Sequence, residues 1–231
     1  MNSREFGFCR HGICFVIGAT VLLASGCKFG ADSTAAGRAT SAGSMSRPNP
    51  NKFSPIGASV CLQQMIKNPT EPFHLSFAEK SSTLDASSVE ADVTPATIDY
   101  TKHDTTAGQT STSTKHLARA QVSELEVDFD LMGPVPWHGE LVAAQDAAKS
   151  AGRESVNGYN TIKYSIDTAN EPAAQKATFL SLMAMKDYRI VGSAWVTSDT
   201  GCLVKYAIDL EQDGKNGNVK RTHFEGNVTK R

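Results

Sequence analysis

Hydrophobic and polar residues alternate along much of the chain, which predicts β-strands. In the run Pro72–Ala78, the side chains of Phe73, Leu75 and Phe77 fall on one face and the residues between them on the other. A period of two is typical of a strand with one buried face. The further runs of this kind are Val89–Val93, Thr97–His103, Glu124–Leu131, Asn160–Asp167, Arg189–Thr197, Leu203–Glu211 and Val219–Thr229. Turn residues at 199–201 and 213–217 join the last three runs as consecutive antiparallel strands.

Helical patterns are fewer. Asn170–Lys186 is the best marked, because Asn170 can cap a helix, Pro172 suits the first turn, and small and apolar residues then recur at helical spacing. Gly139–Ala151 is rich in alanine and stops before Gly152, and Val60–Ile66 is a third, short candidate. Many strands with two or three inserted helices predict an α+β fold with an antiparallel sheet.

The first 27 residues have a different pattern. Arg4 and Arg10 precede the apolar run Ile13–Ala24, and small residues separate that run from Cys27. As a helix this run would be about 18 Å long, whereas crossing the hydrocarbon of a bilayer takes roughly 20 residues. We therefore expect residues 1–26 to be an export signal. An ordinary secretory signal, in which Cys27 is incidental, is the alternative.

Composition divides the rest of the chain into a tether and one domain. Residues 27–51 consist largely of Gly, Ala, Ser and Thr. Such a segment buries too little apolar surface to fold, so it is expected to be flexible. Residues 52–231 then form a single domain, in which the polar tract Asp104–Thr114 predicts a mobile loop over 104–115. The mean hydropathy of -0.29 excludes a polytopic membrane protein. A net charge of -1 lacks the excess of basic residues that is typical of nucleic-acid-binding proteins.

Two cysteines remain in the expected domain, Cys61 and Cys202. In an oxidising compartment they could form a disulfide, which would close a long loop and constrain the unfolded chain. The alternative is a pair of buried free thiols. Neither cysteine has the neighbouring Cys or His that a metal site would need.

Catalytic and metal-binding patterns are not evident. Glu124, Glu126, Asp128 and Asp130 would line one face of a strand at a spacing of roughly 6.5 to 7 Å, too wide for a calcium site. A solvated face opposite lysines is the favoured interpretation. The histidines are scattered, and His138 beside Trp137 is the only one with a distinctive local setting. We expect no enzyme activity, no metal and no cofactor.

The segment Leu23–Cys27 resembles the lipobox of bacterial lipoproteins. That resemblance implies that Cys27 is acylated and becomes the mature N-terminus. Since Lys28 is not the aspartate that retains such proteins in an inner membrane, it also implies sorting to the outer membrane, facing the periplasm. Stable anchoring takes two or more acyl chains, because a single chain holds only marginally.

A second resemblance concerns the domain, and it is carried by Glu90–Pro95, Val156–Tyr164, Gly192–Gly201 and Leu203–Tyr206. These segments are similar to strands and turns of the periplasmic lipoprotein carriers and lipid-binding lipoproteins of the LolA/LolB-like group. The resemblance implies an antiparallel sheet curved as an open half-barrel, with helices over a concave apolar face that holds acyl chains.

Two functions follow as expectations. The first is an anchored lipoprotein that binds or carries a lipid or another hydrophobic ligand. The second is a structural or interaction lipoprotein whose core is filled by its own side chains and which binds an envelope protein. The residues expected to face the ligand are Leu180, Met183, Trp195, Tyr206, Ile208 and Phe224. A large apolar cavity would favour the first function, and a packed core with an exposed patch would favour the second.

Overall fold

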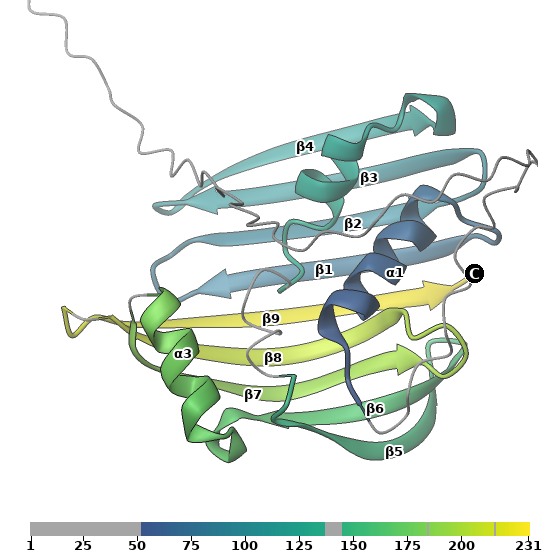
Figure 1. The fold of residues 1–231 in the computed structure, drawn as a ribbon. Coiled ribbons are helices and arrows are strands. Elements are labelled where there is room, and N and C mark those ends of the chain that lie inside the picture. Colours follow the sequence, from purple (N-terminus) through teal and green to yellow (C-terminus); the bar gives the residue numbers. More distant parts are fainter. Residues whose placement is uncertain (1–51, 137–144, 184, 215) are drawn as a thin grey trace, which may run out of the picture. The chain divides into compact units, whose positions relative to one another are not determined.

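In the part of the chain that the structure describes, nine strands form one open antiparallel sheet in the order β4-β3-β2-β1-β9-β8-β7-β6-β5 (Figure 1). The computed structural model describes residues 52–136, 145–183, 185–214 and 216–231, so the expected signal, Cys27 and the expected tether lie outside the described residues. The strands are β1 Phe73–Ser81, β2 Ala86–Val93, β3 Thr97–Thr106, β4 Gln109–Ala118, β5 Ala148–Val156, β6 Tyr159–Asp167, β7 Met185–Thr197, β8 Leu203–Gly214 and β9 Val219–Lys230.

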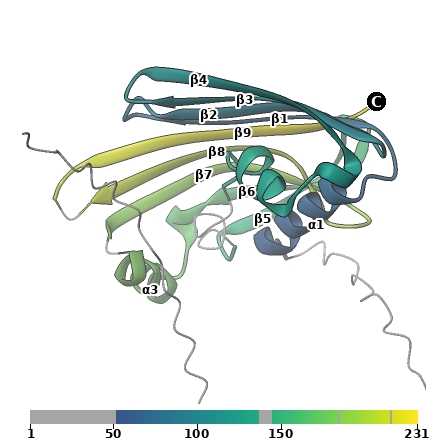
Figure 2. The same ribbon diagram turned by 90° about the horizontal axis from the view of Figure 1, so that it is seen from above.

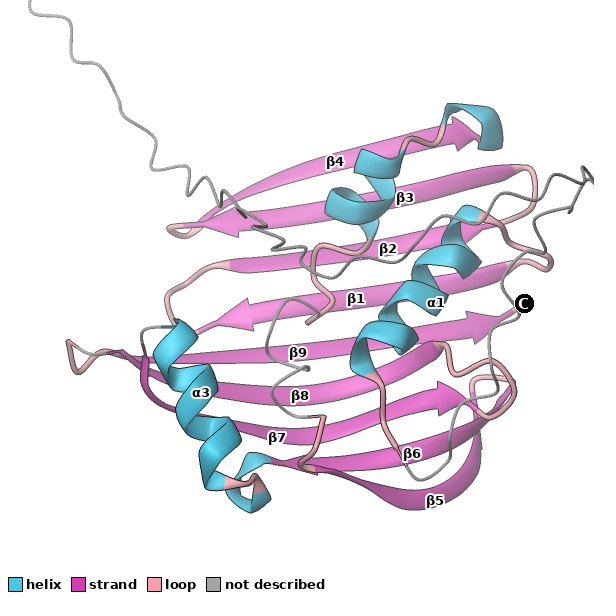
Figure 3. Ribbon diagram, viewed as in Figure 1, coloured by secondary structure: helices cyan, strands magenta, loops and turns pink. Residues whose placement is uncertain are grey.

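Helices lie on one face of this sheet, which we call the inner face. They are α1 Pro55–Lys67, α3 Ala173–Met183, the short 3-10 helices η1 Arg119–Gln121 and η3 Thr168–Asn170, and the π-helix η2 Glu126–Leu131. Figure 2 shows α1 and α3 on the same side of the sheet, and Figure 3 shows how small the helical part is. An open antiparallel sheet with a few helices agrees with the expected α+β class.

The period of two in the sequence sorts side chains between the two faces. Phe73, Leu75 and Phe77 of β1 are buried, while the residues between them are only partly buried. In the register of the sheet, Leu75 faces Ala91 of β2 and Val228 of β9, both also buried. The core therefore lies along the inner face, between the sheet and its helices.

Most of the expected strands are present, and so are the two expected turns near the C-terminus. The expected helices Val60–Ile66 and Asn170–Lys186 correspond to α1 and α3, although α1 is longer than expected. The second helix is shorter at both ends, because Asn170 belongs to η3 and does not cap α3, and Lys186 belongs to β7. Pro55 stands at the first turn of α1, where a missing N–H costs nothing.

The expected mobile loop at 104–115 is wrong. This tract forms the end of β3, a turn at Ala107 and Gly108, and most of β4. Both turn residues have positive φ, 51° and 80°, as tight hairpin turns of the primed types require. The threonines that suggested a polar loop are β-branched and suit a strand. Thr105 and Thr110 face each other across this hairpin, with 2.9 Å between their hydroxyl oxygens.

Two further expectations fail. Glu124–Leu131 is not a strand, because most of it forms η2. Its alternating acids and apolar residues fit a helix whose carboxylates contact lysines to either side. The expected helix Gly139–Ala151 is contradicted at its end, where Ala148–Ala151 belong to β5, and residues 139–144 lie outside the described residues. The Asn157-Gly158 turn, both residues at positive φ, was the signal for the β5–β6 hairpin.

Candidate functional site

Three of the residues expected to line a ligand hollow, Tyr206, Ile208 and Phe224, lie on the inner face and are buried. The Tyr206 ring is 5.9 Å from that of Phe77, and its hydroxyl donates a 3.4 Å hydrogen bond to the carbonyl of Pro134. Burial raises the pKa of Tyr206 well above its ordinary value. This tyrosine therefore contacts the protein's own chain on two sides.

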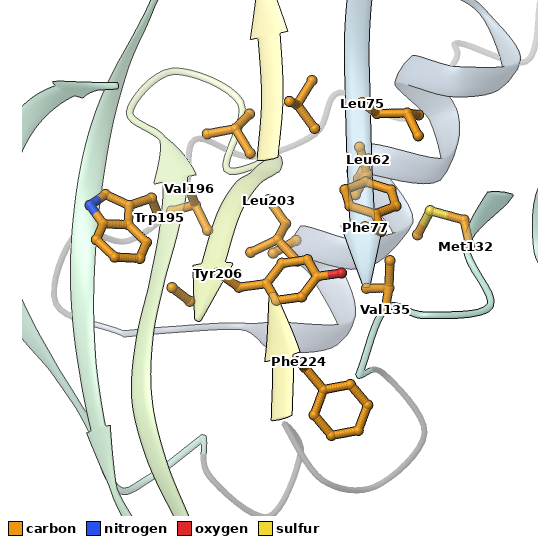
Figure 4. Close-up of a cluster of buried hydrophobic side chains, with 14 of the residues drawn as sticks. Leu62, Leu75, Phe77, Met132, Val135, Trp195, Val196, Leu203, Tyr206 and Phe224 are labelled. Atoms are coloured by element: carbon orange, nitrogen blue, oxygen red, sulfur yellow. The ribbon is translucent and has the colours of Figure 1, made fainter. Parts of the chain in front are cut away.

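The segment over Tyr206 comes from α1 and from the chain that follows η2. Figure 4 shows the Tyr206 ring pointing toward Phe77 and Val135, with Leu62 and Met132 nearby. Leu62 of α1 and Met132 are fully buried, and Val135 is almost so. This part of the inner face is filled by side chains of the protein itself.

The two residues expected from the second helix are less well defined. Leu180 of α3 is partly buried and packs against the core. Met183 is the last residue of α3, and its side chain lies outside the described part of the structure.

Trp195 departs from expectation because it lies on the outer face. It pairs across the sheet with Lys163 of β6 and Lys205 of β8, and the ammonium groups of these lysines stand 4.9 and 4.8 Å from the ring centre. Its indole N–H donates a 2.6 Å hydrogen bond to Glu154 of β5. Figure 4 shows it pointing away from Tyr206. A tryptophan that makes cation–π contacts with two lysines in this way links neighbouring strands and does not line an apolar hollow.

Cys61 of α1 and Cys202, next to the start of β8, lie at disulfide distance, with 4.7 Å between their Cα atoms. Both side chains are buried. The pair brings α1 to the sheet at the point where the chain turns between β7 and β8.

The acidic residues of 124–130 bind lysines around η2. Lys115 of β4 contacts Asp130 at 3.2 Å and Glu126 at 3.3 Å, and the Tyr100 hydroxyl donates a 2.7 Å hydrogen bond to Asp130. On the other side, Lys67 of α1 lies 3.5 Å from Glu124. These contacts hold η2 between α1 and the edge of the sheet. They replace the expected solvated strand face but agree with the expectation that the acids pair with lysines.

The same contacts explain the shifted acid–base properties of this cluster. Burial, followed by the hydrogen bond to Asp130, raises the pKa of Tyr100 to about 12. The pKa of Glu126 is lowered, chiefly by the backbone N–H of Ser123 and further by Lys115. Burial would raise the pKa of Asp130, but hydrogen bonds from Tyr100 and Lys115 outweigh it and lower that pKa. The cluster thus keeps its carboxylates charged, which suits a structural role for the ion pairs around η2.

Among the described residues, no group of three or more His, Cys, Asp or Glu side chains is arranged to hold a metal ion. His74 contacts Asp92 at 2.7 Å and His223 contacts Asp209 at 2.7 Å, both on the outer face. His138, which stood out in the sequence, lies outside the described residues.

The outer face carries hollows of its own. One of about 460 Å³ lies over β7, β8 and β9 and is lined by the charged residues Arg189, Asp209, Glu211, Arg221 and His223. Arg221 contacts Glu211 at 2.7 Å, and Arg189 contacts Asp167 at 3.6 Å. Lys80 also lines this hollow, so its lining carries charges of both signs.

The two edges of the sheet differ. The β5 edge has a bulge between Ser150 and Gly152 and carries Lys149, Arg153 and Glu154. Both features protect an edge from pairing with another chain. The β4 edge runs for ten residues, pairs without a bulge to β3, and contains no proline. Its one Lys, Lys115, is held by the acids of η2.

Sequence reasoning missed this edge because it took the tract for a loop. Six consecutive polar residues, Gln109–Thr114, are exposed on both faces of β4, and five of them are serine or threonine. The strand propensity of threonine was the available signal.

No protein-family model matches this chain, and no curated protein matches it either. In the part of the chain that the structure describes, no helix is both long enough and apolar enough to cross a bilayer.

Proposed function

We propose that this chain is a non-catalytic lipoprotein of the bacterial envelope, anchored through acylated Cys27, whose β-domain binds a protein partner. The observation that supports it most directly is the filled part of the inner face around Tyr206, where this residue contacts Phe77 and the Pro134 carbonyl. A carrier of acyl chains needs apolar space at such positions. Among the functions that the sequence suggested, a self-filled core favours the interaction lipoprotein over the lipid carrier.

The form of the sheet supports the proposal further. It is open, its helices lie on one face, and in our interpretation it is a half-barrel of the kind that the LolA/LolB-like resemblance implies. A half-barrel leaves two edges, of which only β5 carries protective features. The proposed partner adds an extended, polar strand to β4, since main-chain groups of an unprotected edge supply the hydrogen bonds for such pairing.

Two measurements test this function. The first is native mass spectrometry of the acylated protein with solvent extraction. We expect no stoichiometric lipid beyond the acyl chains on Cys27. A lipid that copurifies at one per chain, and is lost in an Ile208→Glu variant that remains folded, would overturn the filled-core argument and restore the carrier.

The second measurement is photo-crosslinking in cells, with a photoreactive amino acid at Thr112 of β4 and, as the matched control, at Ser150 of β5. We expect one discrete adduct from Thr112, none from Ser150, and loss of the adduct when Thr114→Lys is added. Equal crosslinking from both edges would contradict recognition through β4.

A further inference from the structure

Exposed apolar side chains concentrate on two neighbouring helices of the inner layer. Among the described residues, seven large hydrophobic side chains are exposed, and four of them lie in or next to α1 and η2. These are Ile56 and Val60, 56% and 40% exposed, and Leu125 and Phe129, 68% and 67% exposed. We call these four residues the apolar patch.

The helix geometry places each pair on one side of its helix. Ile56 and Val60 are four residues apart in α1, on the side opposite the buried Leu62. Leu125 and Phe129 are also four apart, across the start of η2, whose Val127 and Leu131 are buried. Both pairs therefore point away from the core.

A polar seam joins the two helices between these pairs. Gln63 donates a hydrogen bond to Asp128, and Lys67 contacts Glu124 at 3.5 Å and Asp128 at 4.0 Å. Gln63 and Lys67 follow Val60 along the same side of α1, and Glu124 and Asp128 directly precede Leu125 and Phe129. Lys67 is shared by both carboxylates of the seam, so each of them has a cationic partner beside the patch, although the seam keeps one net negative charge.

The position of the patch in the chain indicates what covers it. α1 begins at Pro55, only 28 residues after Cys27. A tether of that length with the expected coil-like behaviour would span roughly 30 Å. It would keep the patch at high effective concentration near the lipid that holds Cys27.

We propose that the apolar patch docks the domain onto the bilayer surface, with Leu125 and Phe129 in the interfacial region. This inference rests on the proposed anchor at Cys27. Apolar and aromatic side chains that are too few to cross a bilayer can still bind its interface, and a covalent lipid supplies the second attachment. Docking on this side leaves the outer face of the sheet open to a protein.

The test uses the full chain, made in a bacterial host and shown by intact mass to be acylated. It is reconstituted into vesicles of phosphatidylethanolamine and phosphatidylglycerol that contain a trace of photoactivatable phosphatidylcholine. After illumination, we expect peptides covering 55–67 and 123–132 to carry at least fivefold more lipid label than peptides of β4 or β9.

Matched variants make the test specific. Ile56→Glu with Phe129→Glu should reduce the label on both helices at least fivefold. Leu84→Glu with Val219→Glu, which alter two exposed apolar residues elsewhere, should leave it unchanged. All four side chains are exposed, so thermal melting should show both double variants folded.

The outcomes separate the two proposals. Acylated protein whose label is spread evenly, or is unaffected by the patch substitutions, overturns the docking surface while the anchor stands. Crosslinks from the patch to a protein instead of lipid overturn it in the same way. A chain that carries no acyl mass overturns the anchor, and the docking inference with it.

Discussion

At the scale of single residues, the inner face depends on a glycine beneath an aromatic ring. Gly226 of β9 faces Tyr206 of β8. A Cβ atom at this position would lie 2.3 Å from the Tyr206 ring and 2.7 Å from the Phe77 ring. The absence of a side chain at 226 thus allows the two rings to pack over the sheet, and the sequence pattern alone could not show this.

The first prediction concerns this contact. Gly226→Val should lower the free energy of unfolding by about 2 kcal/mol, because overpacking a core typically costs 1 to 3 kcal/mol. Urea unfolding followed by circular dichroism measures it. Glu225→Val, the adjacent change on the exposed side of β9, should have a much smaller effect. Equal stability of Gly226→Val and the parent would mean that the hollow above Gly226 has room, as a carrier requires.

The cysteine pair gives a second prediction at this scale. Cys61→Ser with Cys202→Ser should lower the free energy of unfolding by about 3 to 5 kcal/mol, because a crosslink over so long a loop removes much of the unfolded chain's entropy. The comparison is urea unfolding of parent and variant, each with and without reductant. Reductant should destabilise the parent alone. A parent that is insensitive to reductant and contains two titratable thiols would refute the bond.

At the scale of elements, the third prediction tests the ion pairs that Lys115 forms with Glu126 and Asp130 of η2. The pKa values of Glu126 and Asp130 are lowered in the folded chain. Both carboxylates therefore stabilise the fold fully at any pH above their ordinary pKa values, which are at most about 4.5. This contribution is lost as the pH falls through the lowered pKa values. Lys115→Met removes a cause of both shifts. Its melting temperature should be lower at pH 7 and should fall less than the parent's between pH 5 and pH 3.

The control for that comparison is Lys149→Met, a charge removed from the exposed β5 edge. Its melting curve should follow the parent's at every pH. If Lys115→Met retained the parent's full acid sensitivity, the lysine would not be what lowers the pKa of these carboxylates.

The elements also show what a sequence pattern can predict. Strands such as β1 and β8 bury one face, so their hydrophobic residues alternate and reveal them. Residues 109–114 of β4 are exposed on both faces, so this tract shows no alternation of hydrophobic residues and resembles a polar loop. η2 has alternating acids that imitate a strand, and only its contacts with Lys67 and Lys115 show why a helix forms there.

At the scale of the whole molecule, the candidate site was predicted only in part. Burial of Tyr206, Ile208 and Phe224 follows from their period of two, because that period assigns them to one face. The period does not say what lies against that face, and here it is the chain's own α1 and Val135. Trp195 lies on the other face, because the ordinary alternation of β7 places it opposite Ala194, which pairs with Tyr206, and beside Lys163 and Lys205. The expectation for Trp195 followed its size and apolar character and not its position in that alternation.

The last prediction concerns the division of the chain between anchor and domain. Buried core residues of the described part run from Phe53 to Val228. Deleting residues 30–43, with Cys27 kept, should therefore change the free energy of unfolding by less than about 0.5 kcal/mol, the range typical of changes away from a core. The deletion should still reduce crosslinking from Thr112 to a partner. It leaves a tether of 14 residues in place of 28 between Cys27 and Pro55, which halves the contour length of the tether. A shorter tether restricts the distance from the membrane that the β4 edge can reach. Urea unfolding and the crosslink yield measure the two effects separately. A large loss of stability would show that residues 30–43 belong to the fold. Unchanged stability together with an unchanged yield of the Thr112 crosslink would show that the partner lies within reach of the shortened tether.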